Sequence, residues 1–163
     1  PVRVHQEISV NLLTIFSNYL TNKSCKVYHA PFDVRLPTNL TDSNDQVTSV
    51  VQPDLSIVCN KTYLDDKGCN GAPDIIVEII SPATAKKDLN QKYNLYEENS
   101  VKEYWVVFPK EETIDIYHMG DEGQYQPAIS YDINDQIPIK LFNDQIPIKL
   151  FNGYQIDVND VFK

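Results

Sequence analysis

The ten-residue stretch from Pro73 to Pro82 is the feature that most constrains the fold of this chain. It reads Pro-Asp-Ile-Ile-Val-Glu-Ile-Ile-Ser-Pro, and its branched apolar residues predict a β-strand over 74–80. Burying the carboxylate of Glu78 in such a strand is costly unless a partner or a metal compensates for it. A second Pro-Asp pair, Pro53-Asp54, opens another apolar run over 54–59. Two neighbouring strands that each carry an inward acid predict a cation site.

Strand geometry decides which acids can share an ion. Asp74 and Glu78 lie on the same face of the predicted strand, but at ~3.3 Å per residue they are too far apart to ligate one ion together. Glu78 and Asp54 can share an ion if their strands are adjacent and Asp54 lies level with Glu78. Asp74 is then interpreted as a strand-entry or turn residue.

Lys92 is the candidate cation beside these acids. It lies on a helix predicted over 83–98, where Asp88, Lys92 and Tyr96 are spaced by four and share a stripe. An ordinary Asp–Lys pair on the helix surface is the alternative. The three histidines, His5, His29 and His118, are scattered and are expected to pack or to lie at the surface.

The order of predicted elements indicates a mixed α/β fold with one crossover helix, in a single domain over 1–163. Because the chain opens without Met, we expect it to lack its N-terminal elements. A nine-residue segment, 134–142, is repeated without change as 143–151, through either a duplication or an error in the sequence; one copy can form an edge strand. The predicted elements are a helix over 4–21, a strand or bent strand pair over 26–36, a loop over 37–48, strands over 54–59 and 74–80 separated by a loop over 60–72, the helix over 83–98, strands over 104–108, 113–118 and 125–131, and a last short strand before a helical turn over 158–162.

The net charge of −9 argues against a generally electrostatic nucleic-acid binder, because phosphate contacts need Lys and Arg. It leaves room for a local basic patch, and Lys86, Lys87 and Lys92 gather after the acidic strand; a solvated helix face is the alternative. With no apolar run near the ~20 residues that span a bilayer, we expect no membrane partner. The spacing of Cys25, Cys59 and Cys69 fits no zinc pattern, so we expect reduced thiols and a cytoplasmic protein.

Several blocks of the chain together resemble the Uma-two family of restriction-endonuclease-like proteins, and the resemblance covers nearly the whole chain. It includes His5 with the helix after it, Asp33 to Leu36, and the ending from Gly153 to Phe162. The blocks that carry it are Gln52-Pro53-Asp54-Leu55-Ser56, Gly71 through Pro82, the spaced set Asp88, Lys92 and Tyr96, and Glu103-Tyr104-Trp105-Val106-Val107.

The resemblance implies a PD-(D/E)XK nuclease core, in which a central mixed sheet is flanked by helices and C-terminal β-hairpins follow. It implies that Asp54 and Glu78 bind Mg²⁺ or Mn²⁺ together with the backbone carbonyl of Ile79. The standard motif has a Lys two residues after the Glu, where this chain has Ile80; Lys92 on the following helix matches the family instead. The implied activity is metal-dependent hydrolysis of DNA phosphodiester bonds, with Asp54, Glu78 and Lys92 as catalytic residues.

Two other hypotheses remain beside the endonuclease. The negative charge favours a catalytically inactive descendant of the fold that acts as a binding or assembly module, whereas the joint presence of Asp54, Glu78 and Lys92 favours the enzyme. The other alternative is an α/β domain with an unrelated small ligand. Since nucleases that cut both strands often dimerise, a homodimer is the expected assembly.

Overall fold

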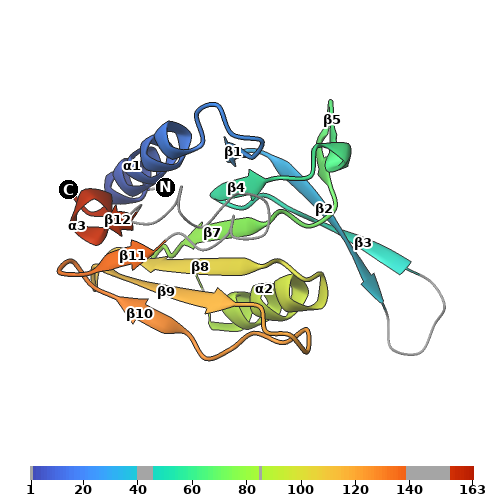
Figure 1. Cartoon of the computed structure of the whole chain (residues 1–163). Helices are drawn as coiled ribbons and strands as arrows, with labels where there is room; N and C mark the ends of the chain where they lie inside the picture. The colour runs from blue at the N-terminus through green and yellow to red at the C-terminus, as the bar shows by residue number, and fades with distance from the viewer. Residues whose placement is uncertain (1, 40–45, 85, 139–154) are drawn as a thin grey trace.

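The computed structural model describes residues 2–39, 46–84, 86–138 and 155–163, and its centre is a six-stranded sheet (Figure 1). β7 and β8 run parallel, and every other neighbouring pair in this sheet is antiparallel. The crossover between β7 and β8 is the helix α2 (Lys86–Glu98), as the sequence predicts. The strands, in the order in which they lie side by side, are β1 (Lys26–His29), β4 (Leu55–Val58), β7 (Ile75–Ile79), β8 (Glu103–Phe108), β9 (Thr113–His118) and β10 (Ile129–Tyr131).

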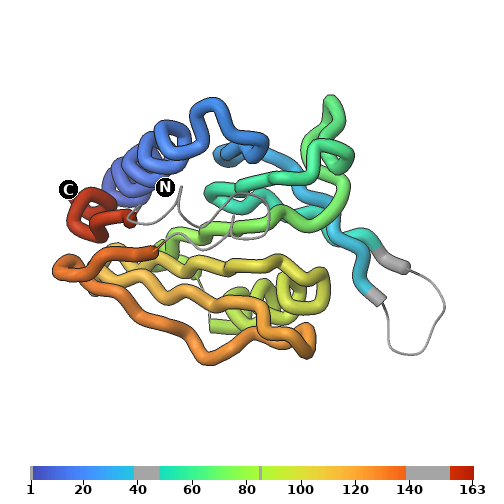
Figure 2. The backbone as a smooth tube through the Cα atoms, in the orientation of Figure 1, coloured from blue at the N-terminus to red at the C-terminus, as the bar shows by residue number. Residues whose placement is uncertain are grey.

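One face of this sheet is covered by α1 (Arg3–Tyr19) and α3 (Val158–Val161), with a two-stranded sheet of β11 (Gln136–Pro138) and β12 (Gln155–Asp157) (Figure 2). Ile8, Leu12 and Phe16 recur at helical spacing and are fully buried against the sheet. The ring of Phe16 meets Trp105 of β8 edge-on, with centroids 5.3 Å apart. This cluster holds the odd-numbered residues of β4, β7 and β8, so the even-numbered ones face the other side.

The other face carries α2 and a four-stranded sheet. Tyr96 of α2 is buried against Tyr104 of β8, with ring centroids 5.0 Å apart. β2 and β3 form an arm that extends beyond the main sheet (Figure 1). The strands of the second sheet, in order, are β3 (Gln46–Val51), β2 (Asp33–Asn39), β6 (Gly68–Asn70) and β5 (Leu64–Asp65), and the 3₁₀ turn η1 (Lys61–Tyr63) precedes β5.

The two loop predictions are wrong where this second sheet forms. The turn-rich segment predicted over 37–48 contains the end of β2 and the start of β3, which pair as an antiparallel hairpin. On one side of β2, β6 pairs only with the residues from Asp33 to Arg35, so β2 has a free edge beyond Arg35. Pro37, which lacks an N–H, can face this free edge without the loss of a hydrogen bond between strands. The loop predicted over 60–72 likewise contains η1, β5 and β6. Both segments gain their structure from partners that local propensity does not reveal.

The expectation of reduced thiols is also wrong for two of the three cysteines. Cys25 and Cys59 form a disulfide, whereas Cys69 is free and buried. Lys26 pairs with Val58 across β1 and β4, and the next step of that antiparallel register sets Cys25 opposite Cys59. The sequence spacing gave no sign of this neighbourhood, because strand pairing creates it.

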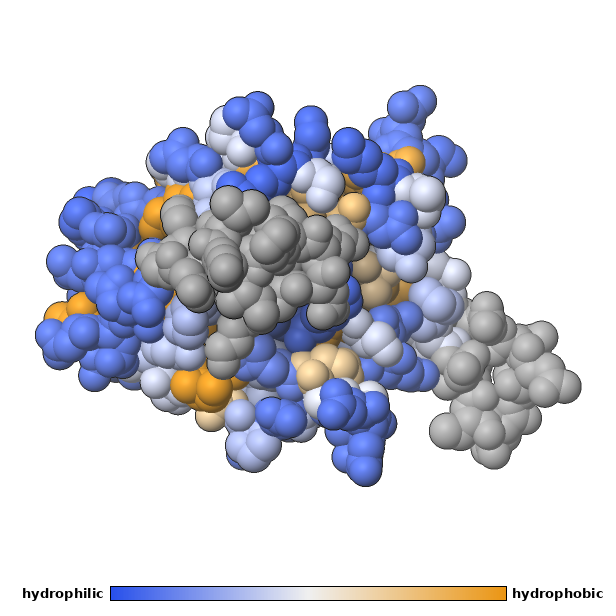
Figure 3. Space-filling view, viewed as in Figure 1, coloured by the Kyte–Doolittle hydropathy of each residue, from blue (hydrophilic) through white to orange (hydrophobic). Residues whose placement is uncertain are grey.

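The remaining predictions concern the chain's ends and surface. Of the nine-residue repeat, the structure describes the first copy as far as Pro138, and its β11 pairs with β12; the second copy lies outside the described residues. Among the helices that the structure describes, none is long and apolar enough to cross a membrane. The coloured atoms of the face in Figure 3 are mostly hydrophilic, with small separate apolar areas.

Replacing both Cys25 and Cys59 with Ser is expected to destabilise the fold. The disulfide closes a loop with a sequence separation of 34, which constrains the unfolded chain. Its loss should lower the free energy of unfolding by about 3–4 kcal/mol under non-reducing conditions. Urea unfolding measures the difference, and a reductant should bring the wild type close to the variant. Equal stability of the two proteins without reductant would contradict the disulfide.

Candidate active site

The pairing of β4 with β7 brings Asp54 level with Glu78. Leu55 pairs with Val77 in this antiparallel ladder, and the next pair along it is Asp54 with Glu78. Directly opposed residues of an antiparallel pair point to the same face. That face is the one that α2 covers, because Ile76 and Val58 pack there. The condition on which a shared cation depends, adjacent strands with the acids level, is therefore met.

Asp54 lies just before β4 and its two oxygens have one contact each. The backbone N–H of Ile79 donates to its Oδ2 over 2.7 Å. Its Oδ1 lies 3.2 Å from Nε2 of His5, in the first turn of α1. Asp54 is thus fixed both by the strand that carries Glu78 and by the helix on the opposite face of the sheet. The Ile79 carbonyl as a metal ligand stays a prediction; its amide is what contacts Asp54.

Glu78 lies deeper, and both of its oxygens meet α2. The Tyr96 hydroxyl donates to Oε1 over 2.7 Å, and Nζ of Lys92 lies 3.2 Å from Oε2. Lys92 and Tyr96 are four residues apart, so one face of the helix supplies both donors. The Glu78 side chain is 7% exposed, whereas that of Lys92 is 37% exposed. Lys92 therefore spans from the buried acid to solvent.

Burial governs the electrostatics of this site. Desolvation raises the pKa of Glu78 above its ordinary value, and the nearby charge of Asp54 raises it further. Lys92 and the Tyr96 hydroxyl oppose this shift by stabilising the carboxylate. Burial and then the charge of Glu78 raise the pKa of Tyr96, so that its hydroxyl stays a proton donor. Without a bound cation, the ionised form of Glu78 is thus only partly compensated.

Asp74 occupies the opposite end of β7, as its interpretation as a strand-entry residue requires. Its Oδ1 accepts from the Cys59 backbone N–H over 2.9 Å, and Lys102 lies 3.4 Å from its Oδ2. These contacts fix the start of β7 against the end of β4. Of the histidines, His29 is exposed and His118 lies 3.6 Å from Glu103. Only His5, among the three, reaches the paired acids.

The three clustered lysines have different surroundings. Lys86 and Lys87 are exposed at the start of α2, while Lys92 turns toward Glu78. The ion pair of Lys92 is therefore with Glu78, and the surface pair with Asp88 is not the one that forms. A common basic patch of these lysines stays a prediction.

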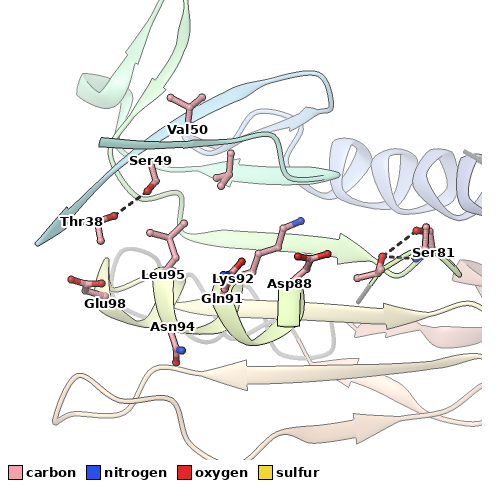
Figure 4. A pocket seen from close by; sticks show the side chains of 13 residues that line it. Thr38, Ser49, Val50, Ser81, Asp88, Gln91, Lys92, Asn94, Leu95 and Glu98 are labelled. Carbon is pink, nitrogen blue, oxygen red and sulfur yellow. Dashed lines mark hydrogen bonds between the residues drawn. The ribbon is translucent and has the colours of Figure 1, made fainter. Parts of the chain in front are cut away.

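A groove of about 790 Å³ with mixed polar and apolar lining leads to Lys92 (Figure 4). Its walls are α2 and the β2–β3 arm, and the turn from Ser81 to Thr84 closes one end. A second, more apolar cavity of about 580 Å³ lies on the other side of this turn and includes His5 and Phe108. The two hollows share Ser81, and each includes a partner of one acid: Lys92, the partner of Glu78, lines the first, and His5, the partner of Asp54, lines the second.

The side chains fit a hard divalent ion better than a soft one. No three His, Cys, Asp or Glu side chains of the described residues are grouped as a metal cluster. Mg²⁺ differs from zinc in needing only one or two protein carboxylates, with water and substrate oxygens completing its shell. Each oxygen of Asp54 and Glu78 has one protein partner and keeps capacity for another. These oxygens are of the kind that Mg²⁺ and Mn²⁺ bind.

The fold and the paired acids are those of a restriction-endonuclease-like α/β protein, and comparison with known proteins agrees with this class. The Uma2 family model, described as "Putative restriction endonuclease", matches residues 1–150. The chain therefore belongs to the Uma2 (Uma-two) family.

Two individual proteins show how far the similarity extends. The uncharacterized protein slr1290 of Synechocystis sp. is 28% identical over 137 residues, which are 83% of this chain and 67% of that protein. A crystal structure described as a putative nuclease belonging to DUF820, from Anabaena variabilis, superposes with a TM-score of 0.72. It covers 99% of this chain and 82% of the other at 15% identity, so it establishes the shared fold.

Sequence reasoning missed the position of His5 and the contact made by Tyr96. His5 was expected to pack or lie at the surface, and its partner Asp54 belongs to a distant segment. Tyr96 stood in the helical stripe with Lys92, but nothing local shows that both reach the same carboxylate. The spacing of four between them is the one signal that could have suggested it.

Glu78→Gln is expected to stabilise the metal-free protein, and more so at pH 8 than at pH 5. The folded pKa of Glu78 is raised, so its contribution to stability falls as the pH rises from its ordinary value through the folded pKa. Gln avoids this loss, which is about 1.4 kcal/mol per unit of pKa shift. The partly exposed Lys92 can turn to solvent in the variant.

Urea unfolding at the two pH values in the presence of a chelator tests this effect. A variant that is less stable than the wild type at pH 8 would show that Lys92 and Tyr96 compensate the carboxylate fully.

Proposed function

We propose that this protein is a metal-dependent endonuclease that hydrolyses phosphodiester bonds in DNA. The observation that carries the proposal is the placement of Asp54 opposite Glu78, with Lys92 on the buried acid, in a chain of the Uma2 family. Two carboxylates and one ammonium suit an anionic substrate that reacts with water, provided that a divalent ion joins them.

In this proposal Asp54, Glu78 and the Ile79 carbonyl hold Mg²⁺ or Mn²⁺. When bound, the ion supplies Lewis acidity that polarises the phosphate and makes water a better nucleophile at neutral pH. Ile79 N–H and His5 orient Asp54, and Tyr96 orients Glu78. Both acids thus enter the reaction already positioned.

Lys92 acts on the substrate side of Glu78. Its partial exposure lets the ammonium approach a phosphate in the groove while it remains within reach of Oε2. There it orients the attacking water or offsets the charge that builds on the phosphate in the transition state. Its place on α2 makes up for Ile80, which stands where the standard motif has Lys.

The alternative of a catalytically inactive binding or assembly module is favoured by the net charge of −9. Such a module needs no divalent ion and gains stability from removal of the buried carboxylate without losing function. Cleavage assays separate these two proposals directly.

Nicking of supercoiled plasmid DNA in Mg²⁺ or Mn²⁺ tests the endonuclease. Asp54→Asn and Glu78→Gln should each lower the rate by about 10²-fold or more, and Lys92→Ala by a similar factor, because each removes charge that acts in the transition state. Asp74→Asn is the matched control, because Asp74 lies at the start of the same strand and does not line the groove, so this change should leave cleavage unchanged. Wild-type protein that cuts with neither ion would refute the proposal, as would equal cutting by Asp54→Asn.

His5→Ala is expected to weaken metal binding by about 10–100-fold, the cost typical of losing a residue that orients a ligand. The change removes the imidazole that contacts Oδ1 of Asp54 and leaves the Ile79 N–H to fix the carboxylate. Titration calorimetry with Mn²⁺ measures the affinity.

His5→Gln, which retains an N–H donor, should recover part of the lost affinity. Unchanged Mn²⁺ affinity in His5→Ala would show that His5 does not position Asp54.

A further inference from the structure

We propose that the groove between α2 and the β2–β3 arm admits one unpaired strand of DNA and excludes the double helix. This inference rests on the proposed function, because it names the form of substrate that reaches Asp54 and Glu78. Three features of the groove support it: its depth, the chemistry of its lining and its charge.

The depth of the site sets what can reach it. Glu78 is almost fully buried, and the more exposed Lys92 connects it to the groove. The groove volume of about 790 Å³ is in the range of sites that enclose a small ligand. A double helix is a wide and stiff rod, so its backbone approaches a recessed side chain less readily than a flexible strand does. A single strand can bend into the groove and present one phosphate to Lys92.

Uncharged hydrogen-bonding side chains are the largest group in the lining, six of the thirteen described residues. Hydroxyl and amide groups contact phosphate oxygens, and amides also pair with the edges of bases. An unpaired strand offers both kinds of partner at once, because its Watson–Crick edges are free. These side chains are Thr38 and Ser49 on the arm, Ser81 and Thr84 in the turn, and Gln91 and Asn94 on α2.

The charge of the groove disfavours a duplex. Among the described residues that line it, Lys92 is the one basic side chain, whereas Asp88 and Glu98 carry negative charge near the two ends of α2. Binding to double-stranded DNA draws its general affinity from several Lys and Arg contacts to closely spaced phosphates. A groove with two acids and one paired lysine cannot supply them. A short unpaired strand brings fewer phosphates near Asp88 and Glu98.

Fluorescence anisotropy with a labelled oligodeoxynucleotide of about 12 nucleotides measures the preference. The probe is compared with a duplex of the same sequence, using the whole chain with Ca²⁺ in place of Mg²⁺ or Mn²⁺, so that an ion compensates the paired acids while cleavage is suppressed. We expect the single strand to bind at least about tenfold more tightly, a difference of about 1.4 kcal/mol. A duplex that binds as tightly as the single strand, or more tightly, would overturn the inference.

Two substitutions on β3 locate the binding surface. Ser49→Trp fills the groove and should weaken single-strand binding about tenfold, or 1.4 kcal/mol. Thr48→Trp is the matched control, because Thr48 is an exposed residue of the same strand and does not line the groove. Circular dichroism confirms that both variants fold. Equal binding by the two variants would place the strand elsewhere.

A gain of affinity gives an independent test. The double variant Asp88→Asn with Glu98→Gln removes both negative charges from the groove and should tighten single-strand binding severalfold at low salt. Unchanged affinity would contradict a strand that passes along α2.

These binding results can be separated from the proposed chemistry. Single-strand binding without cleavage in Mg²⁺ or Mn²⁺ would support the groove and refute the endonuclease. Cleavage combined with a preference for the duplex would support the endonuclease and refute the single-strand groove.

Discussion

The contact between Glu78 and α2 is the interaction on which the site depends. A carboxylate inside the central strand of a sheet is costly to ionise, and the fold compensates it with one ammonium and one hydroxyl from a single helical face. Because β7 and β8 are parallel, the chain must cross over between them, and α2 is that crossover. The same connection that permits a parallel pair therefore delivers Lys92 and Tyr96 to the acid.

This arrangement explains how a nuclease-like site can work with Ile80 where the standard motif has a lysine. A lysine there would extend from the strand itself, beside the metal-binding acid. Here Ile80 packs against the apolar cluster beneath α2, and the positive charge comes from the helix above. The position of the ammonium relative to Glu78 is what the chemistry needs. A lysine on a crossover helix can place an ammonium beside Glu78, as a lysine on the strand can.

Patterns within single elements were enough to predict most of the main sheet. The spacing of Ile8, Leu12 and Phe16 has the helical period. The runs over 74–80 and 104–108 are short and rich in branched or aromatic residues, which favours strands. Partners distant in sequence decided the rest. The β2–β3 arm and the Cys25–Cys59 disulfide form through strand pairing, which local composition does not encode.

The candidate site divides in the same way between what was predictable and what was not. Acids within apolar strands stand out in a sequence because burying them needs a reason, and this was enough to select Asp54 and Glu78. The sequence could say only that the two acids must be level to share an ion. The pairing of Leu55 with Val77 shows that they are level. His5 carried no local signal, since an amphipathic helix tolerates a histidine in its first turn. Its role follows from where α1 crosses the end of the sheet.

The acidity of the whole chain and the proposed substrate are compatible once the local charges are considered. Without a cation, the ionised carboxylates of Asp54 and Glu78 face the single ammonium of Lys92, so the site repels a phosphate. A divalent ion reverses the sign of the local charge and at the same time stabilises the buried carboxylate of Glu78. Binding of the ion and of the phosphate should therefore reinforce each other. In the proposed site, the net charge of −9 would limit phosphate binding elsewhere on the surface and leave the metal-loaded acids as the favoured position.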